Sequence, residues 1–132
     1  MPDATRTWSP VYLPNLPKPV GPYSPAVRAG DFVYVSGQVP RNPATGELPG
    51  DDIRSQSRAV LSNVREVLRT AGATTNDVVS VIVYLVDVDD WAAFNEVYRE
   101  FFAEPYPSRT AVGCSLRGIR VEVSCVAYAP GQ

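Results

Sequence analysis

The 132-residue sequence contains no histidine and only one lysine, Lys18. Without histidine, the chain cannot build a Ser-His or Cys-His nucleophile, and it lacks the commonest metal-ligating side chain. Lys18 lies between two prolines in a proline-rich segment, so we discount Schiff-base chemistry. Any catalysis is therefore expected to use carboxylates, arginine, tyrosine, hydroxyls, cysteine, backbone groups or water.

Cysteine is also scarce, with one residue at Cys114 and one at Cys125. Two cysteines at this spacing do not make a zinc site, and we predict no metal. Both lie in apolar segments near the C-terminal end, so buried free thiols are expected and not a disulfide.

Long hydrophobic runs are missing as well. No apolar run reaches the roughly 20 residues of a membrane span, and residues 1–5 have neither the basic start nor the apolar core of a signal peptide. We therefore expect a cytoplasmic protein without a membrane partner. The net charge is −2, the pI is about 5.0 and the arginines are scattered, which disfavours a nucleic-acid partner.

The length fits one domain with a real core. We expect residues 1–16 to form an extended, proline-containing arm and residues 17–132 to form a single domain. Prolines throughout residues 1–25 exclude helix there and favour extended, irregular structure.

Side-chain periodicity predicts the order β-β-α-β-α-β-β. Alternating or β-branched runs predict strands at residues 26–28, 32–39, 78–88, 109–116 and 121–128. The third of these is apolar enough to be central and covered on both faces. Apolar residues at three- and four-residue spacing predict a helix over residues 51–71, and an aromatic stripe predicts a second, core-facing helix that Asp89 and Asp90 cap. Two helices on one face of a mixed β-sheet make an α+β fold.

Arg109 and Glu122 are the first candidates for chemistry. Arg109 follows a proline-stiffened corner, and its guanidinium offers a planar fork of donors for a carboxylate. The alternative interpretation is that Arg109 is a surface arginine in an exposed ion pair, which would contribute about 0–1 kcal/mol to stability. Glu122 lies inside an apolar strand, where a carboxylate needs a partner or has a raised pKa suited to carrying protons. Its alternatives are an ion pair with Arg117 or Arg120, or a solvent-facing position.

Three further residues are weaker candidates. Gly37 ends a buried strand, where a missing side chain suits a bulge, a close approach by a ligand or a plain strand end. Tyr23 and Tyr98 could donate hydrogen bonds, although most tyrosines do so only structurally.

Seven ordered motifs resemble those of the Rid family, the reactive intermediate deaminases that are also called YjgF or L-PSP proteins. The resemblance covers roughly residues 17–129. The matching stretches are Gly21-Pro22-Tyr23-Ser24, Val35-Ser36-Gly37-Gln38-Val39-Pro40, Thr45-Gly46-Glu47-Leu48, Asn63-Val64 through Leu68 to Ala71-Gly72, Asn95-Glu96-Val97-Tyr98 with Phe101-Phe102, Pro107-Ser108-Arg109-Thr110 and Val121-Glu122-Val123.

The resemblance implies a fold like that of the bacillus-type chorismate mutase, assembled as a homotrimer with clefts between subunits. It implies hydrolysis of 2-imino or 2-enamino acids, such as 2-iminobutanoate and 2-iminopropanoate, to 2-keto acids and ammonia, with no cofactor. Arg109 would bind the substrate carboxylate, and Glu122 would position or activate the hydrolytic water. The other substrate-binding positions implied are Tyr23, Ser36, Gly37, Asn95 and Ala111.

Two departures from the family pattern bear on the substrate range. Ala111 stands where many deaminating members have cysteine, and Ser124 stands where many have a second glutamate. Two alternatives to the deaminase remain: a keto-acid binding or regulatory module with the same fold but no turnover, and an endoribonuclease, which the acidic net charge disfavours.

Overall fold

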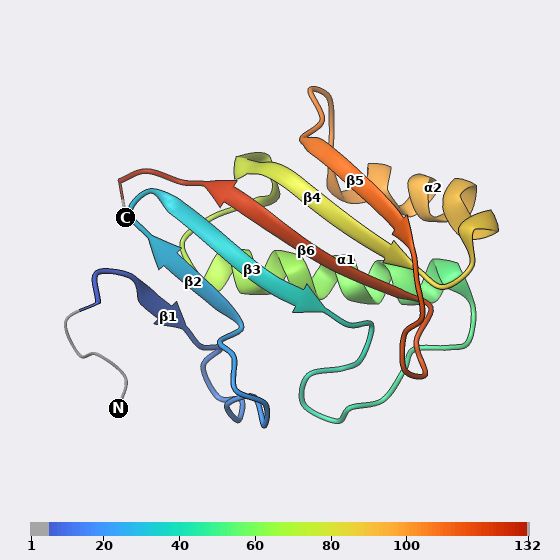
Figure 1. The fold of residues 1–132 in the computed structure, drawn as a ribbon, viewed down its shortest axis with the longest axis horizontal. Coiled ribbons are helices and arrows are strands. Elements are labelled where there is room, and N and C mark those ends of the chain that lie inside the picture. Colours follow the sequence, from blue (N-terminus) through green and yellow to red (C-terminus); the bar gives the residue numbers. More distant parts are fainter. Residues whose placement is uncertain (1–5, 132) are drawn as a thin grey trace.

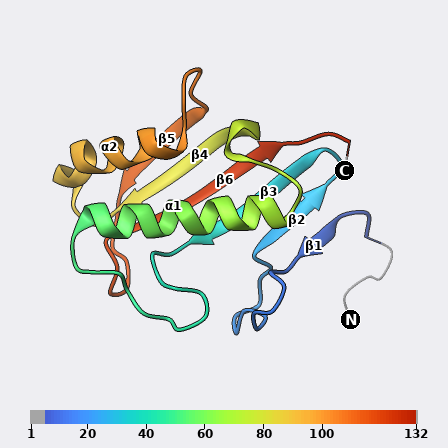
Figure 2. The same ribbon diagram turned by 180° about the vertical axis from the view of Figure 1, so that it is seen from behind.

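The computed structural model describes residues 6–131, which form one six-stranded sheet with two helices packed on one face (Figures 1 and 2). The predicted arrangement of a mixed sheet and two helices on one face is confirmed. The strands are β1 (Ser9–Val11), β2 (Ala26–Ala29), β3 (Phe32–Gln38), β4 (Val78–Leu85), β5 (Ser108–Gly113) and β6 (Val121–Tyr128). The helices are α1 (Ile53–Thr70) and α2 (Trp91–Phe101), with single 3₁₀ turns η1 (Thr75–Asp77) and η2 (Val88–Asp90). No helix in this range is long and apolar enough to cross a membrane.

The strand order is β1-β2-β3-β6-β4-β5, and every neighbouring pair is antiparallel except β4 and β5. Parallel neighbours need a crossover connection, which α2 supplies between β4 and β5. The crossover lays α2 over the edge of the sheet beside β5 (Figure 2).

Three strands differ from the sequence prediction by more than one residue. Strand β1 was not predicted, because prolines hide a strand signal; Pro10 is accommodated since β1 is an edge strand. Strand β4 ends at Leu85 and not at residue 88, because the Asp87 carboxylate accepts a hydrogen bond from Asp89 N (2.9 Å) and starts η2. Strand β5 ends at Gly113 and not at residue 116; Gly113 is paired with Leu85, the last residue of β4, and the following Cys114 N–H still donates to Leu85 O (2.9 Å). Residues 1–5 of the predicted arm lie outside the described residues.

In the single chain β4 is covered on one face only, which differs from the prediction of cover on both faces. Val81, Val83 and Leu85 are fully buried on the helix side, but Ile82 and Tyr84 on the other side are only partly buried. Within residues 6–131 no element covers this second side, which we call the open face. It presents Phe32, Tyr34, Ile82, Tyr84, Glu122, Ser124, Val126 and Tyr128.

Both helices bury the faces that their periodicity predicted. Asp52 caps α1 by accepting a hydrogen bond from Ser55 N (2.9 Å), which lowers the pKa of its carboxyl, and Gly72 follows the helix with a φ of 85°. The expected cap of α2 is corrected in one respect: Asp90 occupies the N-cap position, but its side chain makes no capping hydrogen bond. The aromatic stripe of α2 is core, as predicted; it includes Phe94, Tyr98 and Phe102.

Two polar side chains of α1 hold the ends of β3 and β6. The buried Gln56 donates to Gly50 O (3.0 Å) and accepts from Arg120 N (2.8 Å), just before β6 begins. Asn63 donates to Val39 O (2.8 Å) and to Arg41 O (2.9 Å), just after β3 ends. These bonds fix the backbone just after Gly37 and just before Glu122. Both cysteines are free thiols, as predicted, but only Cys125 is buried; Cys114 is partly exposed.

Candidate functional site

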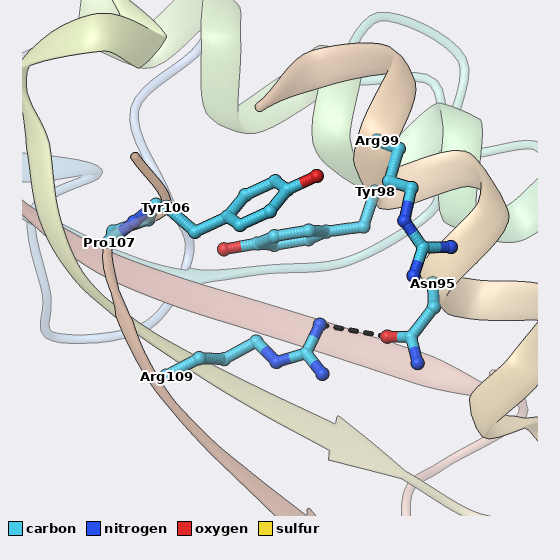
Figure 3. A pocket seen from close by; sticks show the side chains of 6 residues that line it. All are labelled: Asn95, Tyr98, Arg99, Tyr106, Pro107 and Arg109. Atoms are coloured by element: carbon cyan, nitrogen blue, oxygen red, sulfur yellow. Dashed lines mark hydrogen bonds between the residues drawn. The ribbon is translucent and has the colours of Figure 1, made fainter. Parts of the chain in front are cut away.

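Arg109 lies in a pocket of about 270 Å³ between α2 and the start of β5 (Figure 3). Its backbone is paired with Val81, a fully buried residue on the helix side of β4, so the Arg109 side chain also points to the helix side. Nη1 donates a hydrogen bond to Asn95 Oδ1 (2.9 Å). The guanidinium carbon lies 4.8 Å from the ring centre of Tyr98 and 5.7 Å from that of Trp91. An amide and two aromatic faces thus orient this cation.

The partners of Arg109 are all uncharged. Among residues 6–131 it makes no ion pair, which contradicts the interpretation of Arg109 as one member of a surface ion pair. The acids of α2 are committed elsewhere: Glu96 and Glu100 bind Arg54 and Arg58 of α1, at 2.7 and 2.9 Å. The positive charge of Arg109 is therefore available to a bound anion.

Tyr98 forms the floor of this pocket. Its ring stacks on Phe102 with centres 4.5 Å apart, and burial raises the pKa of its phenol to about 12. The hydroxyl stays protonated at neutral pH, and it is buried without a hydrogen-bond partner in the described part of the chain. Tyr98 therefore contributes a flat neutral surface to Arg109 and an unused donor.

Glu122 lies on the open face over Gly37. The register between β3 and β6 shifts between Val35 and Gln38, so a bulge, one of the three interpretations open for Gly37, is present. A Cβ built on Gly37 would overlap Glu122 Oε2 and would lie 3.0 Å from its Cδ. Only glycine leaves room for the carboxylate here, which is the physical reason for this residue type.

The carboxylate of Glu122 has no hydrogen bond or ion pair with any residue in the range 6–131. Neither arginine considered as its partner pairs with it, and the Arg120 side chain instead donates to Asp51 O. A half-buried carboxylate without a local partner is suited to holding a water or a substrate group. It also lines a hollow with Arg117 and Ile119.

Tyr23 and Ser36 lie near the Glu122 end of the molecule. Tyr23 is 59% exposed and lines, together with Gly37, a separate hollow beneath the proline-rich segment that follows β1. Ser36 donates its hydroxyl hydrogen to Ser24 O (2.6 Å), and its backbone N–H bonds to Pro25 O (3.0 Å), so its side chain ties β3 to the segment that holds Tyr23.

The predicted site residues fall into two groups on opposite sides of the sheet. Arg109 and Asn95 share a pocket on the helix side; Ala111, paired with Val83, points to the same side but does not line that pocket. Glu122 pairs with Tyr84 on the open face. Strand β4 lies between β5 and β6, so a single chain does not bring Arg109 and Glu122 together.

Sequence reasoning missed three neighbours of Arg109, namely Trp91, whose ring the Arg109 guanidinium faces, and Arg99 and Tyr106, which line the pocket. A signal was present for the first two, because Trp91 and Arg99 lie four residues before and after Asn95 and so share its side of α2. Tyr106 lies between two prolines and carries no periodic signal. In residues 6–131 no three His, Cys, Asp or Glu side chains are gathered in a way that could hold a metal ion.

Known proteins are similar to this chain along nearly its whole length. A family profile described as Endoribonuclease L-PSP matches residues 14–129. A RutC family protein of Pyrococcus horikoshii is 45% identical over 120 residues, which cover 89% of this chain and 95% of that protein. The 2-iminobutanoate/2-iminopropanoate deaminase of Dermatophagoides farinae is 37% identical over 118 residues, covering 88% and 92%.

Solved structures share the fold. The crystal structure of Escherichia coli TdcF with bound serine matches with a TM-score of 0.82 and 34% identity, covering 91% of this chain and 98% of that one. The α+β fold like that of chorismate mutase, expected from the motifs, is thereby confirmed. The chain belongs to the L-PSP family, the Rid or YjgF family that its motifs indicated.

Proposed function

We propose that this protein hydrolyses 2-imino and 2-enamino acids, such as 2-iminobutanoate and 2-iminopropanoate, to 2-keto acids and ammonia. The observation that carries the proposal is the Arg109 guanidinium, which neutral partners hold in a pocket without any carboxylate. Such a cation is prepared to bind the carboxylate of an imino acid in bidentate fashion. The deaminase name of one relative supports the reaction class.

The proposed chemistry needs few groups, because the carbon of a protonated imine is already electrophilic. Arg109 holds the substrate carboxylate, and Glu122 accepts a proton from water as the water oxygen forms a bond to C2. The resulting carbinolamine takes that proton on nitrogen, the C–N bond breaks and ammonia leaves. As the C2 carbonyl forms, the remaining hydroxyl gives its proton to Glu122, which passes it to the departing ammonia, so one water is consumed and one ammonium ion is released. Asn95 orients Arg109, and Gly37 makes room for Glu122.

We further propose that the site is completed between subunits of a homotrimer. Arg109 and Glu122 lie on opposite sides of the sheet, so the two can meet only when one copy presents Arg109 to the open face of another. The open face is suited to such contact, because it exposes Phe32, Tyr34 and Tyr128 in one aromatic cluster with ring centres 5.2 and 6.5 Å apart. Residues implied by the family motifs, Tyr23, Ser36 and Ala111, would line the same cleft.

The direct test generates 2-iminobutanoate in place with a dehydratase and follows the release of 2-oxobutanoate. We expect the protein to accelerate this release and Arg109→Ala to reduce kcat/KM roughly a hundredfold, because the carboxylate loses its charged partner. Arg65→Ala, which removes an arginine from the outer surface of α1, serves as the control. Full activity of Arg109→Ala would contradict the assigned role.

A second candidate function is the binding of keto acids without catalysis. A non-catalytic keto-acid binding module would show a rise in melting temperature with 2-oxobutanoate and no imine hydrolysis. Binding of a small amino acid by a relative, serine in TdcF, is the observation that favours it.

A further inference from the structure

We infer that the Arg109 pocket accepts imino acids with a second carboxylate, and that Arg99 binds this second group. The inference rests on the proposed function, since it names the substrate class of the same site. It starts from one fact: six residues line the pocket, two of them are arginines and none is an acid.

Arg99 is placed in the pocket by the geometry of α2. It follows Asn95 by four residues, so both side chains lie on the side of the helix that faces the start of β5. Figure 3 shows the Arg99 side chain extending along α2 toward Asn95, which holds Arg109. Arg99, Asn95 and Arg109 therefore line one pocket, and Asn95 is bonded to the second of these arginines.

The charge of Arg99 is not neutralised by the residues around it. Within residues 6–131 Arg99 makes no ion pair or hydrogen bond. The two acids nearest to it in the helix, Glu96 and Glu100, are bound to Arg54 and Arg58 on the side of α2 that faces α1. Two unpaired cations in one pocket repel each other, and a ligand with two negative groups removes that repulsion while a monocarboxylate removes only part of it.

The ligand chemistry follows from this arrangement. One carboxylate is attached to the imine carbon and binds Arg109, and the second is carried on the side chain and binds Arg99. The candidates are 2-imino dicarboxylates with one or two side-chain methylene groups, which arise by two-electron oxidation of the corresponding acidic amino acids. Hydrolysis follows the same balance as above, with one water consumed and one ammonium ion released.

The test compares substrates within each variant. An amino-acid oxidase generates the four-carbon or five-carbon 2-imino dicarboxylate in place, and 2-iminobutanoate serves as the monocarboxylate. We expect Arg99→Gln to lower the ratio of kcat/KM for the dicarboxylate to that for the monocarboxylate about tenfold, as loss of a charge-assisted hydrogen bond predicts. The charge-matched control Arg65→Gln removes an arginine that contacts the Phe101 ring from α1, and it should leave this ratio unchanged.

Three results would overturn the inference. One is an equal loss for both substrates in Arg99→Gln, and another is an equal change in the ratio in Arg65→Gln, which would indicate net charge alone. The third is a lower melting temperature of Arg99→Gln with an unchanged ratio of kcat/KM for the two substrates. Arg99 lies in the last turn of α2, so this result would mean that its charge only stabilises the C-terminal end of the helix.

A binding measurement separates this inference from the proposed function. The rise in melting temperature with 2-oxoglutarate is compared with the rise with 2-oxobutanoate in the wild type and in Arg99→Gln. A selective loss of the 2-oxoglutarate effect without any imine hydrolysis would support the role of Arg99 and refute the deaminase. Hydrolysis by the wild type with no selective effect of Arg99→Gln, in rate or in binding, would support the deaminase and refute the role of Arg99.

Discussion

Two inactive variants of this protein should restore activity to each other when they assemble together. Arg109→Ala removes the carboxylate-binding group on the helix side of the sheet, and Glu122→Gln removes the water-positioning group on the open face. Because each cleft would take Arg109 from one copy and Glu122 from another, a mixed assembly contains some clefts with both groups intact. Neither variant alone can form such a cleft.

The size of the effect follows from the topology. In a random one-to-one mixture, the chance that the copy supplying Arg109 is the Glu122→Gln variant is about one half, and the chance that its neighbour is the Arg109→Ala variant is also about one half. About one quarter of the clefts are then complete, so the mixture should regain about one quarter of wild-type activity. A mixture of wild type with the double variant should also give about one quarter, whereas a site within one chain would give about one half.

The assay unfolds the two variants, refolds them together and follows 2-oxobutanoate release from 2-iminobutanoate. Native mass spectrometry of differently tagged chains establishes that mixed assemblies have formed. The reasoning would be refuted if mixed assemblies formed but showed no more activity than the two variants measured separately.

Two further predictions concern single side chains. Gly37→Ala should leave the fold intact, because the added Cβ meets the flexible end of Glu122. It should nevertheless lower kcat about a hundredfold, because it displaces the Glu122 carboxylate. The check is to measure kcat for Gly37→Ala, for Glu122→Gln and for the double variant; if the two single losses in kcat multiply in the double variant, Gly37 does not act through Glu122. Asp90 has a pKa raised above 3.8 by burial and then by the Asp87 charge, and its Oδ2 is buried without a partner in the described chain. The folded state therefore holds its proton more tightly than the unfolded state, and stability falls as pH rises from 3.8 through the raised pKa. Asp90→Asn should thus have a higher melting temperature than the wild type at pH 7, and the difference between the two melting temperatures should be smaller near pH 3. Thermal unfolding between pH 3 and pH 7 measures this difference. A difference that does not change with pH would contradict a raised pKa at Asp90.

The fold was largely predictable because its signals are local. The spacing of Val60, Leu61, Val64 and Val67 predicts one apolar side of a helix whatever that helix packs against. The alternation from Val121 to Ala127 predicts which face of β6 is buried. Strand β1 was not predicted, because its residues carry no strand signal and it forms only by pairing with β2 at the edge of the sheet. The uncovered face of β4 escaped as well, because apolar residues on both sides of a strand do not indicate what covers each side.

The candidate site was predictable as a set of residues but not as an arrangement. The motifs singled out Arg109, Asn95, Gly37 and Glu122, and the structure joins them in two pairs, Arg109 with Asn95 and Glu122 with Gly37. Neither pairing could be derived from spacing. The first depends on how α2 crosses over β5, and the second depends on the bulge in β3.

The sequence by itself determined which chemistry is open to this protein, because composition is independent of folding: no histidine, one lysine, and an arginine and a glutamate in strands that follow one another along the chain. It also determined the helices and most strands, since their periodicity is written in neighbouring residues. The tertiary structure alone decided that Arg109 has neutral partners, that Arg99 shares its pocket, and that Glu122 points to the opposite side of the sheet. These facts depend on strand register and helix crossing, which arise when segments distant in the chain pack together.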